Sequence, residues 1–295
     1  MLRKPLTFLT GKSVTTVALI LLGLGVTARP AKSFVFALED NNSQIAFESA
    51  IDPNNPNPTN TGILFWNVDN TQQLFQSELW YRLGSTGAEN SISSLSSTVT
   101  QPQPLANTLT ATYAGTGFNI ARAFTLNGGA TGSGISSLLE TITIQNTTSN
   151  PLDFHLFNYN DFDLNQNGSD DTTRIGNGTA TVSDNTLLAR HTVTPASNSY
   201  QVAPIFDIVN SLSDTGTTNL TNVSGPLNGD NSYAFQFYLN LAPGESFSIT
   251  DTKSIVPVPE PPATLSLIVF GGLMLFWRNR QNQARSKKRL SEKKA

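Results

Sequence analysis

The densest group of oxygen-bearing side chains in the sequence is the stretch Asp-Phe-Asp-Leu-Asn-Gln-Asn-Gly-Ser-Asp-Asp at residues 161–171. A calcium-binding loop turns alternate side chains inward from its first, third, fifth and ninth positions. The residues at these positions here are Asp163, Asn165, Asn167 and Asp171, and the twelfth position, which carries a bidentate acid in such loops, is Arg174. The stretch therefore predicts either a calcium site of weak affinity, about 10⁻⁴–10⁻³ M, or an acidic hairpin loop shaped by its Asn-Gly turn. No other cofactor is expected.

Asp161 and Asp163 also form a pair that would share one face at the end of a strand, and glycoside hydrolysis uses two carboxylates. Such enzymes hold the two carboxyl groups on opposite sides of a sugar, and nothing in the sequence raises the pKa of one of them. His155 and His191 are the only histidines, and no Gly-x-Ser-x-Gly elbow accompanies them. We interpret each histidine as a hydrogen-bonded strand residue and expect no enzymatic activity.

Aromatic side chains are the third candidate for chemistry, because exposed rings can stack on sugars. The candidates are Trp66, Trp80, Tyr81 and Tyr113, and in strands such residues more commonly belong to the core. A row of solvent-facing Trp66 or Trp80 would indicate a carbohydrate-binding module. Two carboxylates facing each other across a cleft, about 5–10 Å apart, would indicate a glycosidase.

Period-two alternation predicts the strands that must position these side chains. In residues 233–241 every odd position is apolar, whereas Gln236 and Asn240 fall between them, which places the two sets on opposite faces of one strand. Further strands are predicted near residues 63–66, 74–82, 109–113, 118–126, 142–144, 152–159, 179–183, 187–193 and 247–249. Asn-Gly, Asn-Pro and Pro-Gly turn signals separate them. The predicted fold is all-β, an antiparallel β-sandwich that forms one extracellular domain over residues 33–256.

Other segments of this domain carry more local expectations. Residues 204–212 predict a short helix, and the low-complexity segments 52–59 and 91–103 predict loops without core residues. Arg82 and Arg122 are expected to pair with nearby acids.

Charge is distributed unevenly along the 295 residues. The chain between Lys32 and Trp277 contains five basic and 20 acidic residues, a net charge of −15. Because an acidic surface repels phosphate, we exclude nucleic acid as a partner. The sequence has no cysteine, so disulfides and thiolate chemistry are excluded as well.

The two ends carry targeting patterns. Residues 1–28 combine a cationic start, an apolar run and small residues, which predicts a signal-peptide helix for the Sec export machinery, cleaved after Ala28 or Ala37. A retained membrane anchor is the alternative.

Near the other end, residues 257–262 form a Pro-rich linker, residues 263–277 predict a transmembrane helix, and residues 278–295 predict a basic cytoplasmic tail. The stop-transfer residues of the tail are Arg278, Arg280 and Arg285. For residues 263–277, the alternative is a core helix of the globular domain.

Pro259, Glu260 and Pro261, followed by an apolar helix and a basic cluster, resemble the PEP-CTERM sorting signal of bacterial surface proteins. Short sequence segments of other uncharacterised exported PEP-CTERM proteins are also similar to residues 79–84, 158–164 and 241–249. The resemblance implies recognition by an exosortase, removal of the helix and tail, and delivery from the membrane to the cell surface or the exopolysaccharide. The long extension to Ala295 departs from the shorter tails of many members.

These patterns together predict a non-catalytic structural or adhesive protein of the cell surface or extracellular matrix. An extracellular carbohydrate-binding module is the alternative, and a surface glycoside hydrolase is the further one. The expected partners are the Sec machinery, an exosortase, the membrane before processing, and exopolysaccharide.

Overall fold

The computed structural model describes residues 35–50 and 61–259. The predicted signal peptide, Glu260, Pro261, the apolar segment 263–277 and the basic tail with Arg278, Arg280 and Arg285 lie outside the described residues, as does the predicted loop 52–59. Within the described residues, no helix combines the length and the hydropathy needed to cross a membrane.

The first of two antiparallel sheets has eight strands in the order β1-β2-β3-β4-β10-β16-β14, with β5 paired to β4. Its strands are β1 (Val35–Asp40), β2 (Ser43–Glu48), β3 (Gly62–Val68), β4 (Thr71–Leu83), β5 (Asn90–Ser91), β10 (Leu152–Phe162), β14 (Ser199–Pro204) and β16 (Asn231–Leu241).

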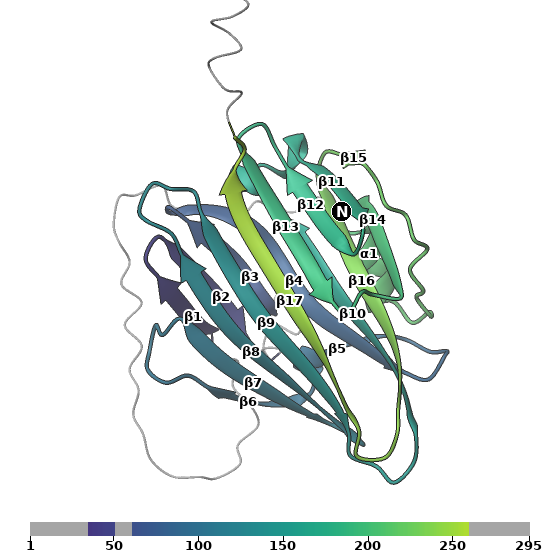
Figure 1. Cartoon of the computed structure of the whole chain (residues 1–295). Helices are drawn as coiled ribbons and strands as arrows, with labels where there is room; N and C mark the ends of the chain where they lie inside the picture. Colours follow the sequence, from purple (N-terminus) through teal and green to yellow (C-terminus); the bar gives the residue numbers. More distant parts are fainter. Residues whose placement is uncertain (1–34, 51–60, 260–295) are drawn as a thin grey trace, which may run out of the picture. The chain divides into compact units, whose positions relative to one another are not determined.

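The second sheet has nine strands in the order β15-β11-β12-β13-β17-β9-β8-β7-β6 and lies in front of the first in Figure 1. Its strands are β6 (Ser96–Thr100), β7 (Thr108–Gly115), β8 (Phe118–Gly128), β9 (Ser136–Asn146), β11 (Thr172–Gly176), β12 (Thr179–Ser183), β13 (Leu187–Thr194), β15 (Leu227–Asn228) and β17 (Ser246–Pro257). The predicted all-β antiparallel sandwich is thus confirmed.

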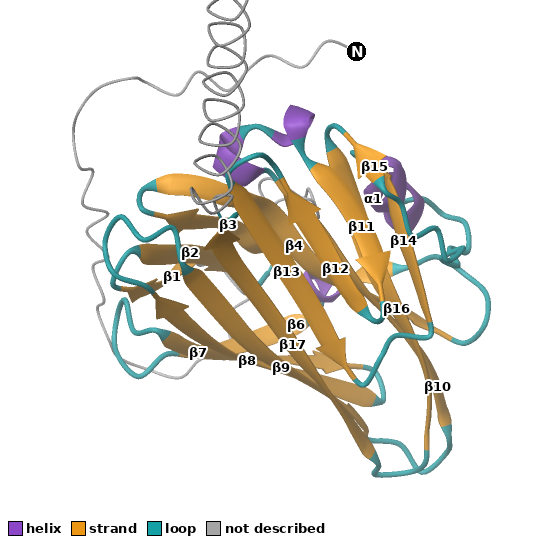
Figure 2. Ribbon diagram, turned by 45° about the horizontal axis from the view of Figure 1, so that its top comes forward, coloured by secondary structure: helices purple, strands orange, loops and turns teal. Residues whose placement is uncertain are grey.

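The core forms because alternate residues of both sheets face inward. In β8, Ile120 and Leu126 are buried while Asn119 and Asn127 are exposed, and the same alternation runs through β7 and β9. A second, smaller cluster of buried residues packs the helix α1 (Asp207–Ser213) against β14 and β16. Figure 2 shows this helix beside β14. The short helix expected over residues 204–212 is present but begins at Asp207, because Pro204 still belongs to β14.

The expectation of a loop over residues 91–103 is wrong. This segment contains the end of β5, the 3₁₀ turn η2 (Ile92–Ser94) and the edge strand β6. The reason is that Ile92 is fully buried and Leu95 and Val99 pack against the core. The β-branched Thr98 and Thr100 also suit the strand β6.

Charged side chains also lie between the two sheets. Arg122 bonds Glu140 at 2.5 Å, and its guanidinium carbon lies 5.4 Å from the ring centre of Phe47. Lys253 Nζ lies 2.8 Å from both carboxylate oxygens of Asp251. His191 Nε2 of the same sheet lies 2.9 Å from this carboxylate, and Asn158 of the facing sheet donates a hydrogen bond to it at 2.6 Å. Because Asn158 donates across the interface, the two sheets are joined by a polar contact as well as by apolar packing.

Candidate functional site

Three carboxylates meet at one end of the eight-stranded sheet. Asp161 is the penultimate residue of β10, Asp163 follows that strand, and Asp230 lies in the turn between β15 and β16. One oxygen from each lies within 4.8 Å of the others. β10 and β16 are neighbours in the sheet, so their pairing brings Asp230 to a position that is distant in sequence.

Burial and mutual repulsion make this cluster costly to ionise. Asp161 is only 1% exposed, and burial followed by the neighbouring Asp163 and Asp230 carboxylates raises its pKa well above the usual value. Burial and the Asp230 charge raise the pKa of Asp163 to about 6. Asp171, also 1% exposed, accepts a hydrogen bond from the Leu164 amide at 3.1 Å, and burial raises its pKa to about 7. All these shifts favour the protonated form.

The structure does not gather the four residues of the expected calcium loop around one point. Asp163 joins Asp161 and Asp230, whereas Asn165 donates to Asp184 at 2.7 Å and Asn167 donates to Asp170 at 2.9 Å. The residue that sequence spacing missed is Asp230.

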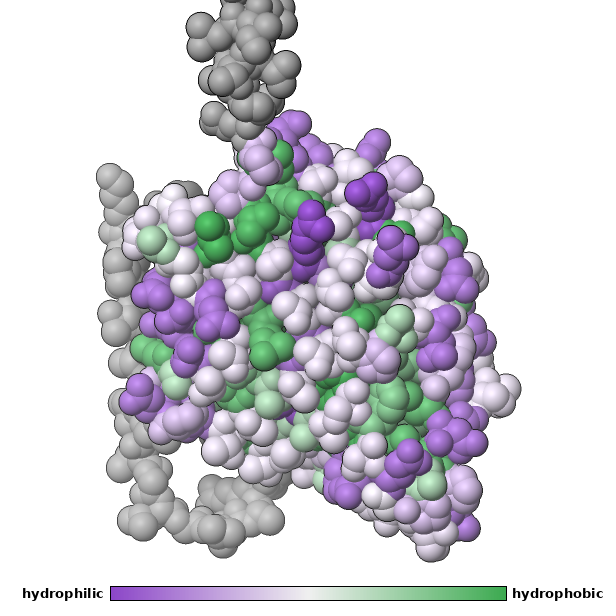
Figure 3. Space-filling model, in the orientation of Figure 1, coloured by the Kyte–Doolittle hydropathy of each residue, from purple (hydrophilic) through white to green (hydrophobic). Residues whose placement is uncertain are grey.

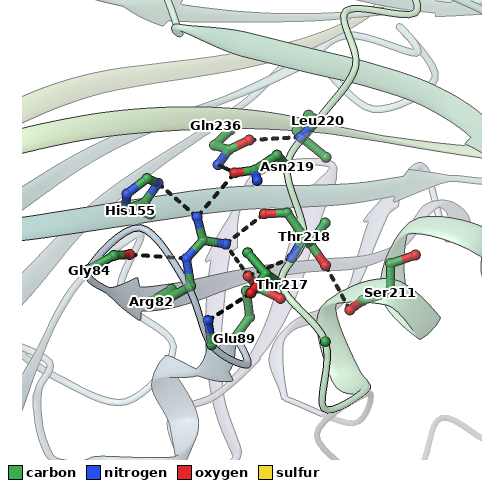
Figure 4. A network of polar contacts seen from close by, with 12 residues as sticks. Arg82, Gly84, Glu89, His155, Ser211, Thr217, Thr218, Asn219, Leu220 and Gln236 are labelled. Atoms are coloured by element: carbon green, nitrogen blue, oxygen red, sulfur yellow. Dashed lines mark hydrogen bonds and ion pairs between the residues drawn. The ribbon is translucent and has the colours of Figure 1, made fainter.

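A second polar cluster surrounds Arg82, from β4, and is drawn in Figure 4. Its Nη1 donates to Glu89 and to the carbonyl of Thr218, its Nη2 contacts His155 Nδ1 and Asn219 Oδ1 at 3.1 Å each, and its Nε donates to the Gly84 carbonyl. All five guanidinium donors are therefore used.

This arrangement makes Arg82 a structural clamp. It is 1% exposed and joins the segments around Gly84 and Thr218 to the sheet, while Leu220 N donates to Gln236 Oε1 at 2.8 Å. Because Arg82 donates to His155 Nδ1, the proton of a neutral His155 belongs on Nε2, which lies 3.3 Å from Asp153. Burial and the Arg82 charge lower the pKa of His155. The expected pairing of Arg82 with an acid is found, but in the interior.

The aromatic residues named as possible sugar platforms are mostly in the core. Trp66 is 0% and Trp80 is 3% exposed, Tyr113 is buried, and Tyr81 is half-buried against Phe118. Stacking on a row of exposed tryptophans therefore has no basis in these residues.

A hollow of about 440 Å³ lies on the outer face of the nine-stranded sheet. Two cross-strand rows form its floor: one contains Thr98, Thr112, Ala121 and Thr143, and the other contains Ser96, Ala114, Asn119, Gln145 and Ser246. Neighbouring strands are about 4.8 Å apart, so the rows extend across roughly 19 Å. In Figure 3 much of this face has the pale colour of residues of intermediate hydropathy, such as threonine and serine.

The chemistry of the hollow is neutral and polar. No charged residue lines it. Besides hydroxyls, amides and the small methyl groups of Ala114 and Ala121, its lining includes Tyr113 and Ile120, whose side chains are buried in the core. Hydroxyls and amides both donate and accept hydrogen bonds, so they suit a ligand that is itself rich in hydroxyls. The acidic cluster differs, because its oxygens lie too close together for a sugar ring to fit between them.

The sequence matches no protein-family model, and no curated protein matches it. Among solved structures, a bacterial glucoamylase complexed with acarbose aligns with 84% of this chain and 37% of its own, with 10% identity and a TM-score of 0.56. A putative aldose 1-epimerase from Escherichia coli K12 aligns with 77% of this chain and 100% of its own, with 11% identity and a TM-score of 0.51. At these identities the likeness concerns the fold alone.

Proposed function

We propose that this chain is an exported, non-catalytic adhesive protein whose β-sandwich binds neutral polysaccharide through the hollow on its nine-stranded sheet. The observation that carries the proposal is the uncharged floor of hydroxyl and amide side chains across five neighbouring strands. The two similar structures are a glucoamylase complexed with acarbose and a putative aldose 1-epimerase, and both names refer to carbohydrates, which agrees with this ligand class.

The expected affinity for one site is low. The hollow has no aromatic platform, and each hydrogen bond contributes about 0.5–1.5 kcal/mol after desolvation. A few such bonds give a dissociation constant on the order of 1 mM, equivalent to about −4 kcal/mol. Attachment to a matrix then depends on many sites acting together, which raises the apparent affinity without new contacts.

The two ends of the chain supply the location in this proposal. Export by the Sec machinery through residues 1–28 would place the sandwich where extracellular polysaccharide is met. Residues 259–261, a membrane helix at 263–277 and the basic tail would deliver it to an exosortase, which would release it at the cell surface. The support for this part is the resemblance to the PEP-CTERM signal.

The test uses two matched variants of β8. Ala121→Arg places a long cation on the floor of the hollow, whereas Ala123→Arg places the same side chain on the same strand and face but outside it. We expect the wild type and Ala123→Arg to sediment with insoluble neutral polysaccharide and Ala121→Arg to lose at least about tenfold in binding. Equal binding by both variants, or no binding of the wild type to any neutral polysaccharide, would refute the proposal.

A further inference from the structure

The carboxylates of Asp161, Asp163 and Asp230 share one small space without a positive partner. In the part of the chain that the structure describes, the ion pairs of Lys, Arg and His involve other acids, and none reaches these three. Three like charges within 4.8 Å repel one another, most strongly at the buried Asp161 and least at the exposed Asp230. A folded protein keeps such a group together when the carboxylates are protonated or when a cation lies among them.

Unpartnered buried oxygens are the independent observation that points to a ligand. Asp161 is 99% buried and faces the other two carboxylates, yet its Oδ1 has no hydrogen-bond partner. Its Oδ2 has a long contact of 3.3 Å from the Tyr159 hydroxyl. Asp163 Oδ1 and Asp171 Oδ1 are also without partners. Buried acceptors left unpaired are costly, and more so when charged, so this set is incomplete as a purely structural cluster.

The backbone also leaves room at the cluster. A Cβ atom added to Gly168 would lie 2.5 Å from Asp163 Oδ1 and 3.2 Å from Asp230 Oδ1. A larger residue would therefore push the two carboxylates away from their present positions. Glycine at residue 168 keeps the space between them open.

We propose that Asp161, Asp163 and Asp230 bind one calcium ion. The donors are all oxygens, which selects a hard cation over transition metals that prefer nitrogen or sulfur. Calcium–oxygen distances of about 2.3–2.6 Å allow ligands on opposite sides of the ion to be about 4.6–5.2 Å apart. The three carboxylate oxygens lie within 4.8 Å of one another, so one calcium ion can reach all three. Magnesium binds at about 2.0–2.1 Å with strict octahedral geometry and usually keeps several of its waters, so a set of three protein carboxylates suits calcium better.

Calcium at this position would fasten two connections that are distant in sequence. Asp163 begins the connection from β10 to β11, which includes η3 (Leu164–Gln166) and η4 (Gly168–Asp170), and Asp230 belongs to the β15–β16 turn. The Gly229 amide already donates to the Asp171 carbonyl at 2.8 Å, so the two connections are in contact. The proposal does not rest on polysaccharide binding, because the hollow uses none of these residues.

The experiment is calcium titration of the full chain by calorimetry, combined with thermal unfolding in EGTA and in calcium chloride. Asp230→Asn removes one exposed ligand, Gly168→Ala fills the space, and Asp170→Asn is the control that removes an exposed charge from the same loop. For a dissociation constant of about 10⁻⁴ M, 10 mM calcium should raise the unfolding midpoint by roughly 5–10 °C.

We expect saturable one-to-one binding in the wild type and in Asp170→Asn, and at least roughly tenfold weaker binding in Asp230→Asn and Gly168→Ala. Absence of saturable binding up to 10 mM calcium would overturn the proposal. Unchanged affinity in both Asp230→Asn and Gly168→Ala would place the ion elsewhere and overturn it too. Magnesium binding as tight as calcium binding would overturn the assignment to calcium.

Discussion

Replacement of the buried Glu78 by glutamine should remove one contribution to the pH dependence of the free energy of unfolding. Glu78 is 1% exposed, its Oε1 accepts a hydrogen bond from Ser91 at 2.9 Å, and its Oε2 has no partner. Burial raises the pKa of Glu78 to about 7, although the Arg122 charge and the Ser91 hydroxyl act in the opposite direction. The folded state therefore binds the Glu78 proton more tightly than the unfolded state does.

The sign and size of the effect follow from this difference. Because the pKa is about 4.5 in the unfolded chain and about 7 in the folded one, Glu78 lowers stability as pH rises between these values. At about 1.4 kcal/mol for each pKa unit, the loss is about 3 kcal/mol. Glutamine stays neutral, still accepts the Ser91 bond through its carbonyl, and avoids that loss.

The measurement is urea unfolding from pH 4.5 to pH 8 at constant ionic strength, followed by fluorescence that includes the buried Trp66 and Trp80. The free energy of unfolding of Glu78→Gln, relative to the wild type, should rise by about 3 kcal/mol across this range. Glu245→Gln, at an exposed position, controls for the exchange of side chains. A difference that stays constant within about 1 kcal/mol from pH 4.5 to pH 8 would show that Glu78 does not titrate as a buried acid.

Two further results are expected. Burial lowers the pKa of His191 to about 4 against the opposing effect of Asp251, so His191 contributes a loss of stability as pH falls from about 6.5 to about 4, opposite in sign to the contribution of Glu78. His191→Gln should remove that loss in the same urea experiment, and an unchanged pH profile would contradict it. In the native host, Glu260→Ala should leave unprocessed chain in the membrane fraction, and normal maturation of this variant would refute the sorting interpretation.

The strands were the most predictable part of the fold because alternation is a local property. Residues 233–241 predicted β16 from their odd apolar positions, and the structure extends that strand to Asn231–Leu241. The prediction of a loop over residues 91–103 was wrong because serine and threonine are common both in loops and in edge strands. Only its pairing with β7, which is a long-range contact, distinguishes the two.

The period-two alternation of apolar residues also indicates which charged side chains are buried. Arg122 falls in phase with Ile120 and Phe124, and Lys253 falls in phase with Ile249 and Ile255. Taken literally, the period places both cations inside the sandwich, where the structure has them. The pairing with an acid that was predicted for Arg122 did not specify that the pair lies in the interior.

The acidic cluster was predictable only in part, for a physical reason. Asp161 and Asp163 are neighbours in sequence, so their proximity follows from local geometry. Asp230 reaches them through the antiparallel pairing of β10 with β16, in which Asn160 lies opposite Tyr233. A spacing pattern within one loop gives no information about how two strands pair. The calcium-loop pattern therefore predicted Asn165 and Asn167 as ligands, whereas their amides donate to Asp184 and Asp170.

The placement of charge is the strongest physical argument for a neutral ligand. In β6, β7, β8, β9 and β17 the ionisable residues Arg122, Glu140, Asp251 and Lys253 are buried, while the outward positions of these strands carry no charged residue. A sheet face open to water normally carries charges of both signs, which keep proteins apart in solution. Burying charged side chains in the interior is costly. Because the outward face of these five strands has no charged residue, it also lacks the charge repulsion that would oppose self-association. A face that meets a neutral, hydroxyl-rich polymer gains from this absence, because no ion then has to be desolvated when the polymer binds.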